Sequence, residues 1–218
     1  MRRGALALLC TLLAARLPAQ AGGDPGVVVV RRATQVYQAI SSLQANFHQH
    51  FEDRLIPNED SKGVLYQEGK NHFAMRFTDP AHDAIIADGR YLWVYTPSET
   101  PGQVMQYPLE NHPTYGTNLL GTFLDDAVDR YRISYVKAET IDGHQTDAVL
   151  MEPLSNDIGF RKATIWFDRE TSVPRRLEIE ELRDHVRVLQ LSEIRTNVSI
   201  PPSTFVCRPP MGTRIISQ

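Results

Sequence analysis

The chain has 218 residues, 42% of them hydrophobic, so it is long enough to bury the core of a complete domain. Its 26 Asp and Glu residues outnumber its 23 Lys and Arg residues. An acidic chain is a poor partner for nucleic acid or for an anionic membrane, so we expect no nucleic-acid ligand.

The first 21 residues have the pattern of a secretory signal peptide. Two arginines precede an apolar run from Ala5 to Leu13, and Ala19-Gln20-Ala21 supplies the small-x-small pattern that signal peptidase recognises. The run is too short to cross a bilayer as a mature helix. Cys10 lies inside the run, whereas a lipid-attachment cysteine follows a complete one, which disfavours a lipoprotein. We expect export, removal of residues 1–21, and a single soluble domain over residues 22–218.

The mature chain is predicted to begin with one helix and then to become almost entirely β. From Pro25 to Ser41, apolar residues recur at the 3.6-residue spacing of an amphipathic helix. From Leu43 onwards apolar and polar residues alternate, which predicts strands at 43–51, 63–67 and 72–77, two more within 83–95, and others at 103–107, 131–138, 146–152, 162–168, 174–181, 186–195 and 204–207.

A second helix is predicted where residues 117–128 interrupt this alternation. Leu119, Leu120, Phe123 and Leu124 recur there at helical spacing. One early helix, one inserted helix and many short-turned antiparallel strands make an α+β domain. A strongly curved sheet or an incompletely closed barrel, with the helices over its concave side, is the expected arrangement.

The hairpin strand 91–95 is bulky and largely apolar on both faces. Tyr91, Trp93 and Tyr95 point to one side, and Leu92 and Val94 point to the other. A sheet with one solvated face should alternate apolar with polar residues. We therefore expect one face of this strand to pack conventionally and the other to face an interior that the helices close.

The sequence holds no recognisable catalytic motif, so we expect no enzyme and no cofactor. His48 and His50 share one face of a strand, but no Cys, Asp or Glu at fixed short spacing completes a metal site. We expect both to face solvent and to bind no metal.

Bulky apolar residues are more numerous than one helix over a flat sheet needs, which permits a cavity for an acyl chain but equally an ordinary core. The candidate cavity residues are Val36, Ile40, Phe47, Phe73, Met75, Phe77, Ile85 and Trp93, and the candidate lid residues are Leu119, Leu120, Phe123 and Leu124.

Four segments resemble the LolA family, the periplasmic carriers of outer-membrane lipoproteins. They are Ser41 to Gln49, the hairpin from Ile85 to Tyr95, Leu150 to Pro153, and Thr204 to Gly212. Their order and spacing match the family from Pro25 to the C-terminus. No single motif is highly specific, but their order together with a signal peptide is.

The resemblance implies an incompletely closed antiparallel β-barrel of about eleven strands, with a helical lid over an apolar cavity. It implies a monomeric periplasmic carrier that shields the acyl chains of lipoproteins. An inner-membrane ABC transporter would load the cargo, and an outer-membrane lipoprotein receptor would accept it. The alternative is a carrier or sensor of another lipid, such as an envelope-stress module.

One departure from the family concerns the lid. The resemblance implies an Arg-Pro pair before the third strand, whose arginine latches the lid by hydrogen bonds. Gly69 and Lys70 occupy the matching positions here. Lys70 or Arg76 could replace the latch, although a lysine lacks the guanidinium fork.

Overall fold

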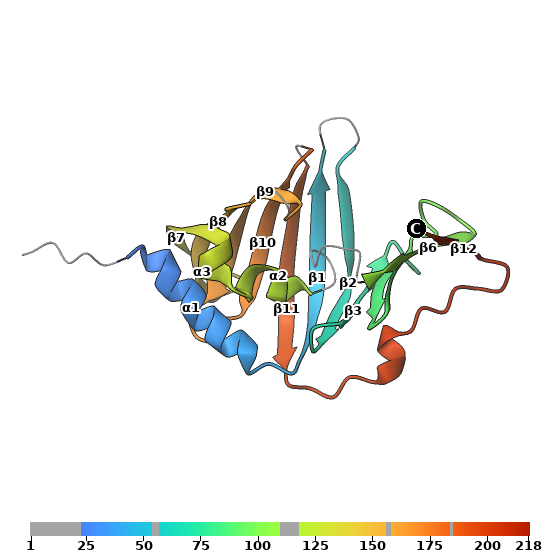
Figure 1. The fold of residues 1–218 in the computed structure, drawn as a ribbon, viewed down its shortest axis with the longest axis horizontal. Coiled ribbons are helices and arrows are strands. Elements are labelled where there is room, and N and C mark those ends of the chain that lie inside the picture. Colours follow the sequence, from blue (N-terminus) through green and yellow to red (C-terminus); the bar gives the residue numbers. More distant parts are fainter. Residues whose placement is uncertain (1–22, 54–56, 110–117, 156–157, 184) are drawn as a thin grey trace, which may run out of the picture.

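The computed structural model describes residues 23–53, 57–109, 118–155, 158–183 and 185–218 (Figure 1). One 12-stranded sheet dominates the fold, in the order β12-β6-β5-β4-β3-β2-β1-β11-β10-β9-β8-β7. Its strands are β1 (Ser42–Glu52), β2 (Glu59–Glu68), β3 (His72–Asp79), β4 (Ala84–Asp88), β5 (Tyr91–Tyr95), β6 (Gln103–Pro108), β7 (Tyr131–Ile141), β8 (His144–Pro153), β9 (Phe160–Asp168), β10 (Pro174–Glu181), β11 (Val186–Thr196) and β12 (Arg214–Ser217). The helices are α1 (Pro25–Gln38), α2 (Leu119–Leu124), α3 (Ala127–Arg130) and the 3₁₀ helix η2 (Pro202–Phe205).

The fold class expected from the sequence is confirmed. Every neighbouring strand pair is antiparallel except β12 with β6, and β7 and β12 are the two edges of an open sheet, as an incompletely closed barrel requires. Within the described residues the sheet has 12 strands, against the expected number of about eleven. Residues 1–21, the expected signal peptide, lie outside the described residues. In the described part of the chain, no helix has both the length and the apolar character needed to cross a membrane.

Helix α1 packs against β7, β8, α2 and α3, on one half of the sheet (Figure 1). Its N-cap is Asp24, whose Oδ1 accepts hydrogen bonds from the backbone N–H of Gly26 at 2.8 Å and of Tyr135 at 2.7 Å. The second bond joins the helix start to edge strand β7. Val30, Ala33 and Tyr37 form the buried stripe that faces the sheet.

The sheet has an inner face, which α1, α2 and α3 cover, and an outer face on the opposite side. Alternation along β1 sends Leu43, Ala45 and Phe47 into the main core on the inner side. Gly63 lies between Phe47 and Phe77 on this face. The rings of the two phenylalanines pack edge to face, with their centroids 5.1 Å apart. A Cβ at Gly63 would come within 2.8 Å of the Phe47 ring, so the glycine allows this aromatic pair to form.

The C-terminal segment covers the outer face of β3 and β4. Phe205 of η2 packs there with Ala74 and Ile86, and Trp93 joins the same cluster. The prediction of a strand over 204–207 is therefore wrong. Pro201 and Pro202 lack backbone N–H groups and favour a turn of 3₁₀ helix, and the last strand is β12 instead.

The single helix predicted within 117–128 is two short helices. Residue 117 lies outside the described residues, and α2 ends before Asp125. Asp126 adopts a left-handed conformation with φ of 51°, which interrupts the helix before α3 begins.

Candidate functional site

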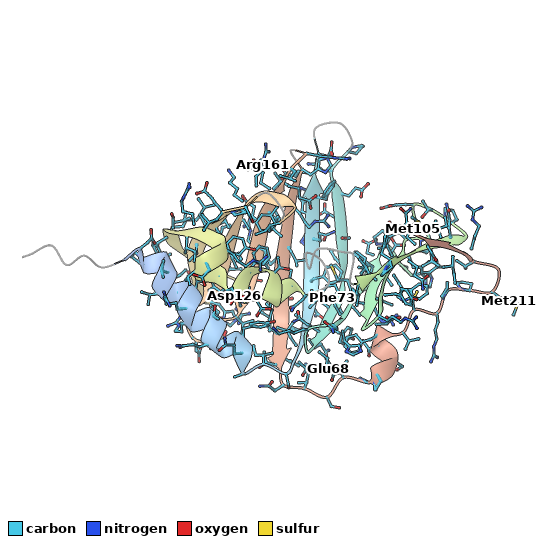
Figure 2. All side chains as sticks on the ribbon, in the orientation of Figure 1. Glu68, Phe73, Met105, Asp126, Arg161 and Met211 are labelled. Carbon is cyan, nitrogen blue, oxygen red and sulfur yellow. The ribbon has the colours of Figure 1, made fainter. Side chains whose placement is uncertain are left out.

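The inner face of β3 to β6 carries two apolar rows that become more exposed towards the sheet edge. Met75, Ile85, Val94 and Met105 are direct cross-strand neighbours in the first row. Phe73, Ala87, Leu92 and Tyr107 form the second row in the same way. The β3 residues are buried, whereas all four residues on β5 and β6 are half-exposed. Figure 2 labels the two ends of this surface, with Phe73 beside α2 and Met105 on β6.

A pocket of about 570 Å³ opens beside the first row, where β3 ends and β4 begins. Phe51, Phe77 and Ile85 supply its apolar lining, and polar side chains including Glu59, Asp60 and Arg187 also line it. The volume falls in the usual range of pockets for small ligands, about 300–1,000 Å³.

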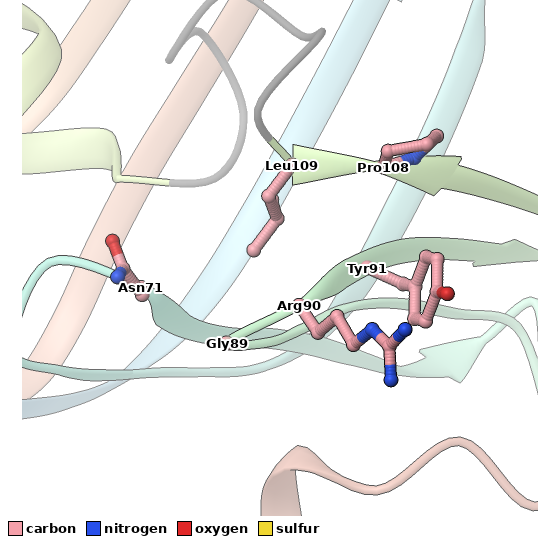
Figure 3. A pocket seen from close by; sticks show the side chains of 6 residues that line it. All are labelled: Asn71, Gly89, Arg90, Tyr91, Pro108 and Leu109. Carbon is pink, nitrogen blue, oxygen red and sulfur yellow. The ribbon is translucent and has the colours of Figure 1, made fainter.

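A second pocket, of about 610 Å³, lies at the opposite end of the same strands (Figure 3). The side chain of Leu109 projects from the end of β6 towards the space between Asn71 and Arg90 (Figure 3). Arg90 lies over the ring of Tyr91, 5.1 Å from its centroid. The apolar rows thus lie between two pockets with polar margins.

Most of the sequence-predicted cavity residues lie on this inner side. Phe47, Phe73 and Met75 are buried in the main core. Phe77 and Ile85 are half-exposed and line the first pocket. Val36 and Ile40, at the end of α1 and just after it, pack against the core margin.

Trp93 does not share this face, and its assignment to the cavity is corrected. Its side chain packs in the outer cluster, and its Nε1–H donates to Asp88 Oδ2 at 2.7 Å. Leu92 and Val94 are the β5 residues that face inwards, because neighbours along a strand point to opposite sides. With Met105, they are site candidates that the sequence analysis missed, although the alternation of 91–95 already separated them from Trp93.

Helix α2, which carries the predicted lid residues, lies over the inner face. Its six residues are all buried, and the predicted lid residues Leu119, Leu120, Phe123 and Leu124 belong to the main core. The ring of Phe123 lies 5.5 Å from that of Phe160 on β9. Helix α2 is therefore packed into the core in this structure.

A buried asparagine attaches the N-terminus of α2 to other elements. Asn118 is 1% exposed, and its Oδ1 accepts hydrogen bonds from the backbone N–H of Gly121 and from Gln67 Nε2, both at 2.8 Å. Its Nδ2 donates to the Tyr37 hydroxyl at 3.2 Å. Burial raises the pKa of Tyr37, although the bond with Asn118 opposes this, so the hydroxyl stays protonated. One side chain thus joins α2 to both α1 and β2.

The sequence analysis did not identify Asn118, although an asparagine directly before an apolar helical run is typical of an N-cap. No pattern indicated its long-range partners, which lie 51 and 81 residues away.

The C-terminal end of α2 is held by its backbone carbonyls. Thr34 Oγ1 donates to the Leu124 carbonyl at 3.2 Å, and the Tyr131 hydroxyl donates to the Thr122 carbonyl at 2.6 Å. Helix α2 is therefore tied to α1 and β7 at this end.

The side chains of the two candidate latch residues lie on different sides of the sheet and have different partners. Lys70 Nζ lies 3.4 Å from Asp125 Oδ2 just after α2, but the lysine side chain is 72% exposed, so the pair is weak. Arg76 cannot be a lid latch, because its side chain is on the outer face. Its Nε and Nη2 donate to the Thr204 carbonyl at 3.1 and 2.7 Å, and Nη2 also donates to the Val206 carbonyl at 3.2 Å.

His48 and His50 both contact the same carboxylate. His48 Nε2 and His50 Nδ1 lie 3.0 and 3.1 Å from Asp60 Oδ1. The hydrogen bond with His50 lowers the pKa of Asp60, with a smaller contribution from His48. Over the described ranges, no group of three or more His, Cys, Asp or Glu side chains could hold a metal ion.

Comparison with known proteins identifies the family of this chain. The family described as "Outer membrane lipoprotein carrier protein LolA" matches residues 38–208. An outer-membrane lipoprotein carrier protein from Alkalilimnicola ehrlichii is 27% identical over 189 residues, which cover 83% of this chain and 79% of that protein.

Two solved structures share the fold. An uncharacterised conserved protein from Thermus thermophilus has a TM-score of 0.56 at 10% identity, over 89% of this chain and all of that one. The structure of MucB has a TM-score of 0.51 at 12% identity, over 84% of this chain and 63% of that one. The family match spans most of the sequence and includes the inner rows, α2 and η2, so the chain belongs to the LolA family of outer-membrane lipoprotein carriers.

Proposed function

We propose that this protein is a periplasmic carrier that shields the acyl chains of lipoproteins in transit from the inner to the outer membrane. The observation that carries the proposal is the graded exposure of the two inner rows, from buried Met75 and Phe73 to half-exposed Met105 and Tyr107. An apolar surface that continues out of a core offers an acyl chain a place to lie.

The energetics suit reversible carriage. Each buried methylene group contributes about 0.8 kcal/mol, so a chain that covers only the half-exposed part of the rows is held without being trapped. The polar lining of the pocket beside Phe77 would leave the peptide part of the cargo in solvent. Family membership supports an inner-membrane ABC transporter as donor and an outer-membrane lipoprotein receptor as acceptor.

Two adjacent residues of β5 provide a matched test. Val94 faces inwards and Tyr95 faces outwards, and both are half-exposed. We expect Val94→Glu to weaken binding of a fluorescent diacylated peptide at least about tenfold, because a carboxylate would have to be desolvated beside the chain. Tyr95→Glu should bind like the native protein.

The measurement is a fluorescence titration of the mature protein, with circular dichroism to verify that both variants are folded. Equal affinity of the two variants, or no binding by the native protein, would refute the proposed site. Equal binding of free fatty acid and acylated peptide would favour the alternative of a carrier or sensor of another lipid.

A further inference from the structure

The C-terminal segment, residues 194–218, differs in charge from the rest of this acidic chain. All 26 Asp and Glu residues precede position 194, whereas Arg195, Arg208 and Arg214 lie within the segment. In the described parts of the chain, no carboxylate forms an ion pair with Arg208 or Arg214. Both side chains are exposed. The chain as a whole has a negative net charge, but this segment contains only basic charged side chains.

This segment is held in place rather than trailing from the domain. Arg76 fixes its first part through the carbonyls of Thr204 and Val206. Its last part pairs with β6, and the backbone N–H of Arg214 donates to the Gly102 carbonyl at 2.9 Å. Figure 1 shows the segment passing from β11 under β3 and around to the edge of the sheet at β12. Its exposed side chains thus have defined positions.

Large apolar side chains are exposed along the same segment. Val206, Met211 and Ile215 have exposed fractions of 40%, 104% and 53%. The backbone N–H of Thr213 donates to the Pro210 carbonyl at 3.1 Å, which closes a tight turn with Met211 at its tip. Figure 2 shows Met211 at the end of the molecule furthest from α1.

We propose that this C-terminal edge, made of Val206, Arg208, Met211, Arg214 and Ile215, docks on the surface of an anionic phospholipid bilayer. Arginine side chains pair with lipid phosphates, and exposed Met and Ile side chains enter the boundary between headgroups and acyl chains. The acidic remainder of the protein is repelled by the same surface, so the protein approaches edge first. This contact goes beyond acyl binding and does not require it, because no residue of the edge belongs to the inner rows.

The affinity of the edge for the bilayer should be low, because a carrier has to dissociate from the membrane again. A basic residue near an anionic surface contributes on the order of a fivefold increase in partitioning. Two arginines therefore contribute about 25-fold, and screening should weaken this at high salt.

The test is sedimentation of the full mature protein with vesicles. We would compare vesicles of phosphatidylcholine alone with vesicles that also contain phosphatidylglycerol, at low and high salt. The paired variant Arg208→Glu/Arg214→Glu removes the charge, and Met211→Ser removes the apolar tip. Leu182→Ser/Arg183→Glu is the matched control, because both residues are exposed on the β10–β11 connection instead.

The native protein and the control should bind the anionic vesicles in a salt-dependent way. The paired arginine variant should lose about 25-fold or more, and Met211→Ser a smaller factor. The proposal is overturned if the native protein binds neither vesicle, or if the arginine variant binds like the control. It is also overturned if that variant keeps vesicle binding but loses cargo delivery, since the edge would then serve a protein partner. Titration with acylated peptide checks the inner site independently.

Discussion

Asn118→Ala should loosen the lid without unfolding the sheet. The substitution removes the N-cap of α2, which is worth about 1 kcal/mol. It also removes the shorter of two hydrogen bonds from the buried Nε2 of Gln67, at 2.8 Å, and leaves only a bond of 3.4 Å to the Gly69 carbonyl, at a cost of about 1–3 kcal/mol. The loss of about 2–4 kcal/mol falls on contacts that exist only when the lid is closed. The open population should therefore rise about 30- to 1,000-fold.

Hydrogen exchange of the α2 amides is the assay. We expect faster exchange of the amides in residues 119–124, while the amides of strands β8 and β9 stay protected from exchange. Asn118→Ser should have a smaller effect, because serine retains a capping oxygen. Asn71→Ala, at an exposed position of the β2–β3 turn, is the control. Unchanged exchange of α2 in Asn118→Ala, or uniform loss of protection over the whole domain, would refute the reasoning.

Three other substitutions test the fold around the site. Gly63→Ala should destabilise the protein by about 3 kcal/mol in urea denaturation, because its Cβ would lie 2.1 Å from the Arg76 carbonyl oxygen; a smaller cost than about 1 kcal/mol would contradict this packing. Arg76→Ala should cost about 1–2 kcal/mol and speed exchange at 204–206, and unchanged exchange there would show that the arginine does not hold the segment. Burial opposes ionisation of Asp168, but hydrogen bonds from the Thr171 backbone and from Arg175 lower its pKa overall. Its contribution to stability is therefore present above the unfolded value of about 4 and is lost as the pH falls through the folded value. Acid titrations should show a smaller pH dependence for Asp168→Asn than for the native protein, and identical curves would contradict this role.

The strands could be predicted because their period of two is local. Phe73, Met75 and Phe77 alternate with polar or small residues, and β3 forms where this pattern indicates. The assignment of Trp93 failed for a different reason. Alternation separates the two faces of a strand but does not say which face is inside, and here both faces are covered.

The missing information was long-range. Trp93 lies on the outer face of the sheet, in a cluster with Phe205 of η2. This helix comes more than a hundred residues later in the chain. The lid attachment through Asn118 similarly depends on Gln67 and Tyr37, which come from other elements. A single sequence indicates that an apolar face needs a cover, and folding decides which segment supplies it.

Site-specific photocrosslinking can determine whether acyl chains lie on the inner face of β3 to β6. A photoreactive amino acid would replace Val94 or, as the control, Tyr95, in cells whose lipoproteins carry an alkyne-labelled fatty acid. We predict crosslinks to labelled lipoproteins from position 94 and few or none from position 95. Equal labelling from both positions, or none from position 94 while the protein is folded and exported, would contradict the account.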